Sequence, residues 1–376
     1  MFRCSYRIMP NSLENSSLLT YSADEKPDSS GKITDKQLRE KINWFTDRYL
    51  DKNDDFIRAS YSKIRLLLHP FEYIKTHVQS TFLMKNPVKI TNAFMKMYEF
   101  LKSRRIPDSV RKSGVIRMFD IASAPGMFII AAELFYGRFG ISVDWHACSL
   151  PKTDTNTALS DEYGLYENNP ERFTPCDLLN KDDIEKIIRQ GQKYPLVTGD
   201  AGVQFDNYSE LQELAQLDLQ WRQMYLALNL CEKGGSIYIK LYTVLTEETH
   251  YLIDTISQYF SFVRVIKPFT SRLLNRETYI IANDRNDTPL KITIDRPIFK
   301  KYESVNKDAY LAYEHDRENL KRELITEIQP ILQENNRISV SELSRKSPRY
   351  AKFYDGVKSL INTFNATFYM HSRLWF

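Results

Sequence analysis

Between residues 115 and 283 the chain alternates short runs of β-branched and aromatic residues with longer runs in which apolar residues recur at helical spacing. The short runs predict strands at residues 115–122, 143–149, 196–201, 234–242, 262–268 and 278–283. This alternation predicts an α/β domain whose mostly parallel sheet is covered by helices on both faces. The link between the last two strands is too short for a helical crossover, so these strands should be antiparallel neighbours.

The segments between these strands follow the same logic. Helices are expected at residues 127–136, 182–190, 209–231 and 247–259, with Ser209 as the N-cap of the third. Residues 163–173 are polar and are interpreted as a loop that contains the aromatic residue Tyr166. Ten of the twelve glycines lie between Gly114 and Gly235, which sets this α/β region apart from two glycine-poor flanks.

Both flanks are expected to be mostly helical. Residues 1–35 are interpreted as a loosely ordered arm, and helical spacing then runs from Thr34 to about Phe82. The chain from Ile298 onward is polar and helical, and its charge run at residues 314–318 is interpreted as a solvated face. The predicted organisation is an N-terminal arm and helical extension (1–84), an α/β domain (85–290) and a helical C-terminal extension (291–376).

Composition narrows the class of protein. With 42% hydrophobic and 27% charged residues the chain is globular, and its net charge of +4 permits a polyanionic partner without requiring one. The four cysteines form no CxxC pair, so neither a zinc site nor a disulfide framework is expected, and no bound metal is predicted. No apolar run reaches the ~18 residues of a membrane span, and no targeting signal is visible. We therefore expect a cytoplasmic protein that needs no membrane.

One turn has the character of a ligand site. Ser123–Gly126 joins the first predicted strand of the α/β region to an apolar helix through small residues. Small residues let a ligand lie against the backbone, and free amides at a helix start favour a carboxylate or a phosphate. Many strand-to-helix turns contain proline and glycine, so this turn alone identifies no ligand.

Four charged residues stand out by position. Asp200 and Lys240 each end a predicted strand, Glu277 begins the last one, and Lys96 lies in a helix predicted at residues 92–101. Strand ends in an open parallel sheet share one crevice, where these groups would perturb one another's pKa values. The alternative interpretation makes Lys240 a solvated edge residue and Lys96 a solvated helix residue.

With these motifs in place, the chain resembles the FtsJ-type S-adenosylmethionine-dependent RNA ribose 2′-O-methyltransferases. The matching segments are residues 120–128, 198–202, 234–240, 267–272 and 277–279, within a region from about Lys85 to Arg285. The resemblance implies a Rossmann-like seven-stranded sheet with an antiparallel last strand. It also implies that Lys96, Asp200, Lys240 and Glu277 form the family's catalytic tetrad. Residues 92–97 and the insert with Gln204–Asp206 are more similar to the cap-specific branch, which includes enzymes of large cytoplasmic DNA viruses.

The resemblance also implies a set of cofactor-binding residues. They are Asp120, Ser123, Ala124, Pro125, Gly126, Met127, Phe128, Ser149, Asp177 and Asp200. Two positions depart from the family pattern: Met127 replaces a second glycine, and Ser149 replaces an acid at the end of the second strand. Close approach of the cofactor then requires that Met127 already belongs to the helix. Asp177 would bind the adenine, and its alternative role is the N-cap of the following helix.

The implied reaction is methylation of a ribose 2′-hydroxyl, most simply on the first transcribed nucleotides of a capped mRNA. Lys240 would be the general base, with its pKa lowered by Lys96 and the cofactor's sulfonium and raised by Asp200 and Glu277. Two alternatives stay open: a methyltransferase of ribosomal or transfer RNA, and a non-catalytic RNA-binding subunit that keeps the fold. No G-x-G-x-x-G motif supports a dehydrogenase.

Several basic residues are candidate contacts for RNA phosphates. They are Arg104, Arg105, Arg111, Lys112, Lys152, Lys267 and Arg272. A second basic cluster near the C-terminus contains Arg345, Lys346, Arg349 and Lys352 among Tyr350, Phe353 and Tyr354. A methylated guanine cap is a cation that an aromatic pair would hold, but the sequence does not select the pair. The helical extensions are candidate surfaces for proteins of a capping or transcription apparatus.

Overall fold

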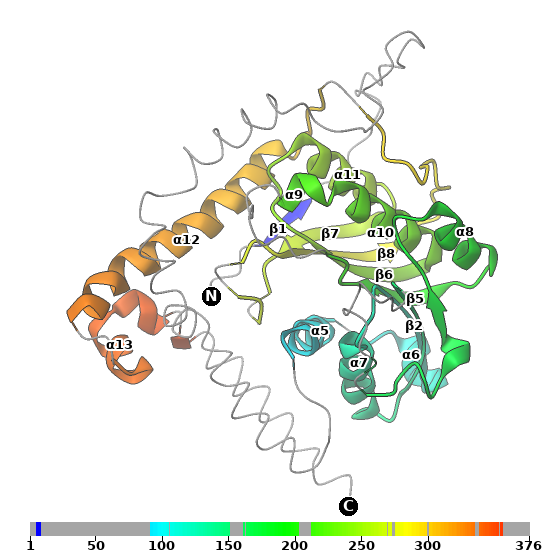
Figure 1. Cartoon of the computed structure of the whole chain (residues 1–376), viewed down its shortest axis with the longest axis horizontal. Coiled ribbons are helices and arrows are strands. Elements are labelled where there is room, and N and C mark those ends of the chain that lie inside the picture. Colours follow the sequence, from blue (N-terminus) through cyan, green and yellow to red (C-terminus); the bar gives the residue numbers. More distant parts are fainter. Residues whose placement is uncertain are drawn as a thin grey trace, which may run out of the picture.

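A mixed eight-stranded sheet forms the centre of the protein (Figure 1). The computed structural model describes residues 5–8, 91–104, 106–150, 161, 163–202, 212–268, 270–272, 275–298, 301–334, 338–352 and 354–355. The strands are β1 (Ser5–Ile8), β2 (Val115–Ile121), β3 (Ser142–Ser149), β4 (Phe173–Pro175), β5 (Tyr194–Gly199), β6 (Cys231–Leu241), β7 (Phe260–Ile266) and β8 (Thr278–Arg285). Their order across the sheet is β1-β7-β8-β6-β5-β2-β3-β4.

The direction of the strands divides the sheet into two parts. Strands β4, β3, β2, β5 and β6 are parallel to one another. Strand β8 lies between β6 and β7 and is antiparallel to both, so the predicted antiparallel pairing of the last two strands is confirmed. Seven of the strands make the sheet expected from the family resemblance, and β1 adds an antiparallel edge strand beside β7.

Two predictions about individual elements were wrong, and one strand was not predicted. Residues 5–8 were assigned to a loose arm, but they pair with β7. The loop predicted at residues 163–173 includes a 3₁₀ turn (Pro170–Arg172), and the short strand β4 at its end was not predicted. The long helix predicted at residues 209–231 is broken at Gln216 into α9 (Gln212–Ala215) and α10 (Leu217–Leu230). Its proposed N-cap, Ser209, lies outside the described residues.

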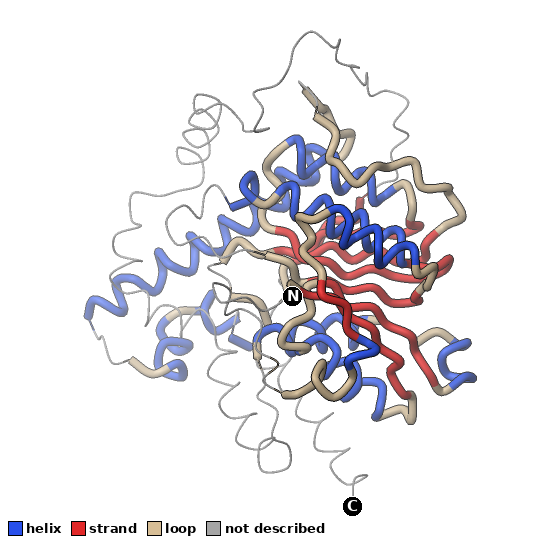
Figure 2. The backbone as a smooth tube through the Cα atoms, turned by 45° about the vertical axis from the view of Figure 1, so that its right-hand side comes forward, coloured by secondary structure: helices blue, strands red, loops and turns tan. Residues whose placement is uncertain are grey.

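Helices cover both faces of the sheet, as the alternation of elements predicts (Figures 1 and 2). One face carries α5 (Asn92–Ser103), α6 (Asp108–Ser113) and α7 (Met127–Gly137). The other carries α8 (Lys181–Arg189), α10 and α11 (Glu247–Ser257). Alternate side chains of the strands point to the two faces, so each face has its own apolar core.

Two helices follow the sheet, α12 (Lys307–Glu334) and α13 (Val340–Lys346). The start of this region is held by a buried carboxylate on α11, because Asp254 accepts hydrogen bonds from Tyr302, Asn306 and Tyr310. The interpretation of residues 314–318 as a solvated face is wrong for Glu314. Its side chain is buried, and Oε1 accepts a hydrogen bond from the Val244 amide at 2.8 Å.

The ends of the chain carry two further predictions. The helical spacing from residue 34 to 82 lies outside the described residues. The domain boundaries at residues 84/85 and 290/291 stay predictions. Among the helices that the structure describes, none combines the length and apolarity needed to cross a membrane.

Candidate active site

Four charged side chains from distant parts of the sequence meet at one edge of the sheet. Asp200 directly follows β5, Lys240 is the penultimate residue of β6, Glu277 directly precedes β8, and Lys96 projects from α5. Because β5 and β6 are parallel, their carboxyl ends lie together, and the antiparallel β8 brings its start to the same edge.

Hydrogen bonds and ion pairs connect the four residues. The Lys96 ammonium donates to Glu277 Oε1 at 2.6 Å and lies 3.8 Å from Asp200 Oδ2. The Lys240 Nζ lies 3.3 Å from Asp200 Oδ1 and 3.4 Å from Glu277 Oε1. The interpretations of Lys240 and Lys96 as solvated residues are wrong, since their side chains are 15% and 6% exposed. We call this group the tetrad.

A fifth residue, Tyr279, completes the cluster and was not predicted. Its hydroxyl lies 2.6 Å from Asp200 Oδ1 and accepts a hydrogen bond from Lys96 Nζ at 2.8 Å. The ring is fully buried between the tetrad and Tyr238, whose ring stacks on it at 4.6 Å. The spacing of Glu277 and Tyr279 could have revealed it, because residues two apart near a strand share one face.

The loop before β8 fixes the Glu277 carboxylate. Ser271 Oγ and Asn275 Nδ2 donate to Glu277 Oε2 at 2.9 and 3.1 Å. Lys267 donates to the backbone carbonyls of Asn275 and Glu277 at 2.8 and 2.7 Å. The ammonium that was a candidate phosphate contact therefore already holds this loop, which sets the direction of Glu277.

The opposite charges of the tetrad favour the charged forms of its lysine and glutamate side chains. Burial tends to lower the pKa of Lys240, but Asp200 and Glu277 outweigh it and raise that pKa above its ordinary value. Burial tends to raise the pKa of Glu277, but Lys96, Lys240 and Lys267 hold it well below its ordinary range. The expectation of a lowered Lys240 pKa is thus wrong for the site without ligands, because the attraction of two carboxylates within 3.4 Å outweighs the effect of burial.

The loop after Asp200 packs closely against Lys240, and at Gly202 there is no room for a side chain. A Cβ at Gly202 would lie 2.3 Å from the Tyr242 hydroxyl oxygen and 3.0 Å from Lys240 Nζ. Gln223 on α10 accepts from the Ala201 amide at 2.9 Å and donates to the Lys240 carbonyl at 3.2 Å. Gln223 thereby ties the Asp200 loop to β6 and fixes the separation of Asp200 and Lys240.

The predicted cofactor turn has an unusual backbone. Ala122 and Gly126 both have positive φ angles, of 54° and 87°. A Cβ at Gly126 would lie 2.4 Å from Leu165 Cδ2, so only glycine fits there. Helix α7 begins at Met127, which confirms that the replacement of the second glycine falls inside the helix and leaves the turn open to a ligand.

Beneath this turn lies a buried carboxyl group. Asp120 accepts hydrogen bonds from Ser123 Oγ and Thr198 Oγ1, both at 2.6 Å. Burial raises the pKa of Asp120 to about 7, with a smaller contribution from the Asp200 charge and in spite of the two hydroxyl donors. The Asp120 side chain thus contacts the turn through Ser123. Met127 and Phe128 on α7 are instead buried in the apolar core, where the Phe128 ring lies 5.9 Å from that of Tyr238.

The ends of β3 and β4 lie beside the turn. Ser149 Oγ accepts a hydrogen bond from the Ala124 amide at 3.3 Å, which links β3 to the turn. Asp177 Oδ1 accepts from the Leu179 amide at 2.8 Å, and the N-cap of α8 is Asn180. The alternative role of Asp177 as that N-cap is therefore wrong. The predicted contact of Asp177 with the adenine stays a prediction.

These residues fit S-adenosylmethionine. The first amides of α7 have no side-chain cap, which suits the carboxylate of an amino acid, and the glycine-only position at Gly126 allows close approach. The Ser149 hydroxyl and the Asp177 carboxylate would take the ribose and adenine ends. The Asp200 amide donates to the carbonyl of Ile121 at the end of β2, and its carboxylate lies 3.3 Å from Lys240 Nζ, so Asp200 connects the strand before the turn to the tetrad.

The predicted phosphate contacts are dispersed. Arg111 and Lys112 are exposed on α6, Arg272 is half-buried, and Arg104 packs over the Phe100 ring and donates to Ser236. Arg105 and Lys152 lie outside the described residues.

The basic cluster near the C-terminus is partly neutralised. Arg349 Nη1 lies 3.8 Å from Glu323, and its Nε lies 3.9 Å from Glu327. Tyr350 is fully buried, so its ring is not available to a ligand, and Phe353 lies outside the described residues.

The chain is similar in sequence to known methyltransferases. A model of the FtsJ-like methyltransferases matches residues 90–285. The chain is 29% identical over 238 residues to a protein of African swine fever virus named "Probable methyltransferase", across 57% of this chain and 53% of that one. It is 28% identical over 225 residues to cap-specific mRNA (nucleoside-2′-O-)-methyltransferase 2 of Danio rerio, across 56% of this chain and 30% of that one.

Among solved structures, human methyltransferase-like protein 13 in complex with SAH aligns with a TM-score of 0.36 at 10% identity, over 61% of this chain and 93% of that one. The chain spans about half the length of the viral relative and less than a third of the zebrafish relative.

Proposed function

Since this chain belongs to the FtsJ-like methyltransferase family, we propose that it methylates a ribose 2′-hydroxyl of RNA through the tetrad. Its cofactor is S-adenosylmethionine, which supplies a methyl group carried on a positively charged sulfur. The observation that carries the proposal is the position of Lys240, whose Nζ lies within 3.4 Å of both Asp200 and Glu277 at the rim of the sheet.

A hydroxyl is a weak nucleophile until a base takes its proton. Lys240 is the proposed base, and Asp200 and Glu277 fix the direction of its ammonium. Because these carboxylates raise the Lys240 pKa, the residue keeps its proton in the site without ligands. The positively charged sulfur of the bound cofactor would lower that pKa, because like charges disfavour the ammonium form. Lys240 would then release its own proton to solvent and accept the proton of the 2′-hydroxyl. Lys96 and Tyr279 would also orient the hydroxyl and hold its charge.

We propose capped mRNA as the substrate, with the methyl group placed on the first transcribed nucleotides. Support comes from relatives in Danio rerio and Dictyostelium discoideum, which are named as cap-specific mRNA 2′-O-methyltransferases and are 28% and 25% identical to this chain. Similarity at this level over part of those proteins supports the reaction more strongly than the choice of RNA.

Transfer of a tritiated methyl group to short RNAs tests both parts of the proposal. A capped RNA should be labelled, and the same RNA with a 2′-deoxy sugar at the labelled nucleotide should not. Labelling of ribosomal or transfer RNA in preference to capped RNA would contradict the substrate. Calorimetric binding of S-adenosylhomocysteine without transfer to any RNA would contradict catalysis and favour a non-catalytic RNA-binding subunit.

A further inference from the structure

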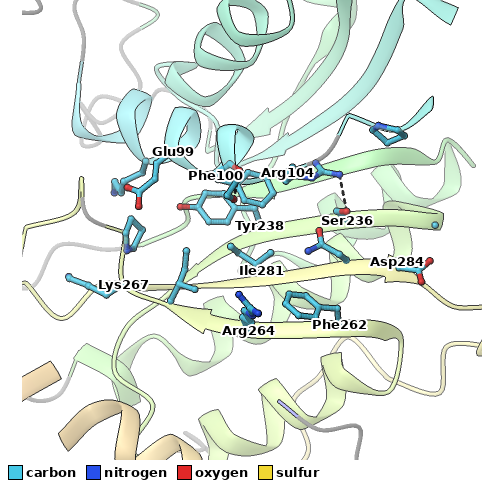
Figure 3. A pocket seen from close by; sticks show the side chains of 17 residues that line it. Glu99, Phe100, Arg104, Ser236, Tyr238, Phe262, Arg264, Lys267, Ile281 and Asp284 are labelled. Carbon is cyan, nitrogen blue, oxygen red and sulfur yellow. Dashed lines mark hydrogen bonds between the residues drawn. The ribbon is translucent and has the colours of Figure 1, made fainter. Parts of the chain in front are cut away.

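A groove leads away from the tetrad along one face of the antiparallel strands (Figure 3). Its volume is about 430 Å³, which is within the range of pockets that hold small ligands. Helix α5 forms one wall, and β6, β8 and β7 form the floor. Lys96 of the tetrad lines one end, so a ligand in the groove would be continuous with one at the active site.

The floor of the groove is built from cross-strand rows. The row nearest the active site is Lys240, Tyr279 and Ile266, and the next is Tyr238, Ile281 and Arg264. The third row is Ser236, Asn283 and Phe262. The opposite face of these strands, with Val263, Ile280 and Ile237, belongs to the apolar core under α10 and α11. The groove face thus carries polar side chains among its apolar ones, whereas the opposite face is apolar.

Three polar atoms at the groove are buried and have no hydrogen-bond partner among the residues that the structure describes. They are Arg104 Nη1, Arg264 Nε and the Tyr238 hydroxyl. All three can donate a hydrogen bond, and a buried donor that makes no bond destabilises the protein. Their convergence on one groove indicates a ligand that offers several acceptor oxygens.

The charges and rings of the groove narrow that ligand further. Two guanidinium groups lie there, and each stacks on a ring, Arg104 on Phe100 at 5.3 Å and Arg264 on Phe262 at 4.5 Å. Guanidinium groups suit phosphate oxygens, and guanidinium planes beside aromatic rings suit unpaired bases. A protein partner would present fewer acceptor oxygens to these three donors than the phosphates of a nucleic acid would.

We propose that this groove holds the single-stranded RNA next to the nucleotide being methylated, with Arg264 and Arg104 on its phosphates. The proposal rests on the proposed function for the identity of the nucleic acid. Besides the contacts at the tetrad, the RNA would then contact this groove, which is lined by α5 and the antiparallel strands and is about the size of one nucleotide.

The test compares two groove variants with one matched control in the full chain. Arg264→Gln removes a phosphate contact, and Asn283→Asp adds a negative charge to the groove almost without a change of shape. Arg117→Gln is the control, because Arg117 on β2 also stacks on a ring, Tyr194 at 4.9 Å, but lies outside the groove. Fluorescence anisotropy measures binding of a long single-stranded RNA and of a capped dinucleotide.

Both groove variants should weaken binding of the long RNA by about fivefold to tenfold and reduce the slope of log affinity against log salt by about one for Arg264→Gln. The capped dinucleotide and the control should be unchanged. Wild-type affinity of both variants for the long RNA would overturn the proposal and leave the groove to a protein partner. Anisotropy measures RNA binding and needs no methyl transfer. An enzyme that is inactive on every RNA would therefore contradict the proposed function, while the test of the groove would still depend only on the binding data.

Discussion

The two halves of the candidate active site each contain a buried carboxyl group, but the pKa values of the two groups are shifted in opposite directions. Asp120 lies under the cofactor turn and Glu277 lies in the tetrad, and they are 1% and 7% exposed. Burial raises the pKa of Asp120 to about 7. The pKa of Glu277 is instead held well below its ordinary range, because three lysines outweigh the same effect of burial.

The difference lies in the donors around each carboxyl group. Asp120 receives hydrogen bonds from two neutral hydroxyl groups, which satisfy its oxygens without compensating its charge. Glu277 receives an ammonium at 2.6 Å from Lys96 and lies 3.4 Å from Lys240. Equal burial therefore produces a group that titrates near neutral pH in one half and a permanently charged group in the other. We infer that the tetrad half is organised around charge and the turn half around backbone shape.

Removal of the Lys240 side chain should have the largest effect, because it disrupts the charged half of the site and leaves the turn half intact. Lys240→Ala should slow methyl transfer by about 10²–10⁴-fold, the range for loss of a general base. S-adenosylhomocysteine should bind with nearly unchanged affinity, because the turn half is untouched. The measurements are initial rates of tritiated methyl transfer and calorimetric titration.

The matched control for this prediction is Lys233→Ala on the same strand, whose ammonium pairs with Asp287 at the surface. It should retain the wild-type rate. Because Asp200 and Glu277 raise the Lys240 pKa, the wild-type rate should also increase with pH into the alkaline range. A Lys240→Ala enzyme that methylates RNA at the wild-type rate would refute the role of Lys240 as base.

Much of the fold follows from the sequence because its strands are locally distinct. The alternation of elements predicted six strands and the antiparallel end of the sheet, as the structure has them. Strand β4 escaped prediction because three residues that end in proline carry no alternation. Strand β1 escaped because its pairing with β7 joins segments more than 250 residues apart, as the pair Ile8 and Val263 shows.

The sequence predicted which residues form the tetrad, but it did not predict how their pKa values shift. Position at strand ends singled out Asp200, Lys240 and Glu277, whereas Lys96 lies in a helix and joined them through the family resemblance. The structure brings all four together. The direction of the Lys240 pKa shift depends on distances to charges of both signs, which no spacing in the sequence supplies. Glu314 likewise looked solvated within its charge run, because only the folded chain places the Val244 amide beside it.

A smaller effect should follow from fixing Asp120 in its neutral form. Its folded pKa lies above the unfolded value of 3.8, so the stability it contributes is present below about pH 4 and is lost as pH rises through 7. Asp120→Asn should therefore flatten the decline of stability between pH 5 and 8, by on the order of a few kcal/mol at most. Thermal unfolding of both proteins across this range measures it, and parallel pH curves would show that Asp120 is already ionised at pH 5.

The smallest effect should come from a third buried carboxylate, Asp254, whose side-chain donors are neutral, as they are for Asp120. Tyr310→Phe deletes one donor, at 2.6 Å, and leaves the other two in place. The expected cost is about 1 kcal/mol of unfolding free energy, the typical net contribution of one hydrogen bond. Tyr225→Phe on α10 is the control, and chemical denaturation is the measurement. A much larger loss, accompanied by slower methyl transfer, would contradict this expectation and would mean that docking of α12 is coupled to the active site through Glu314 and Val244.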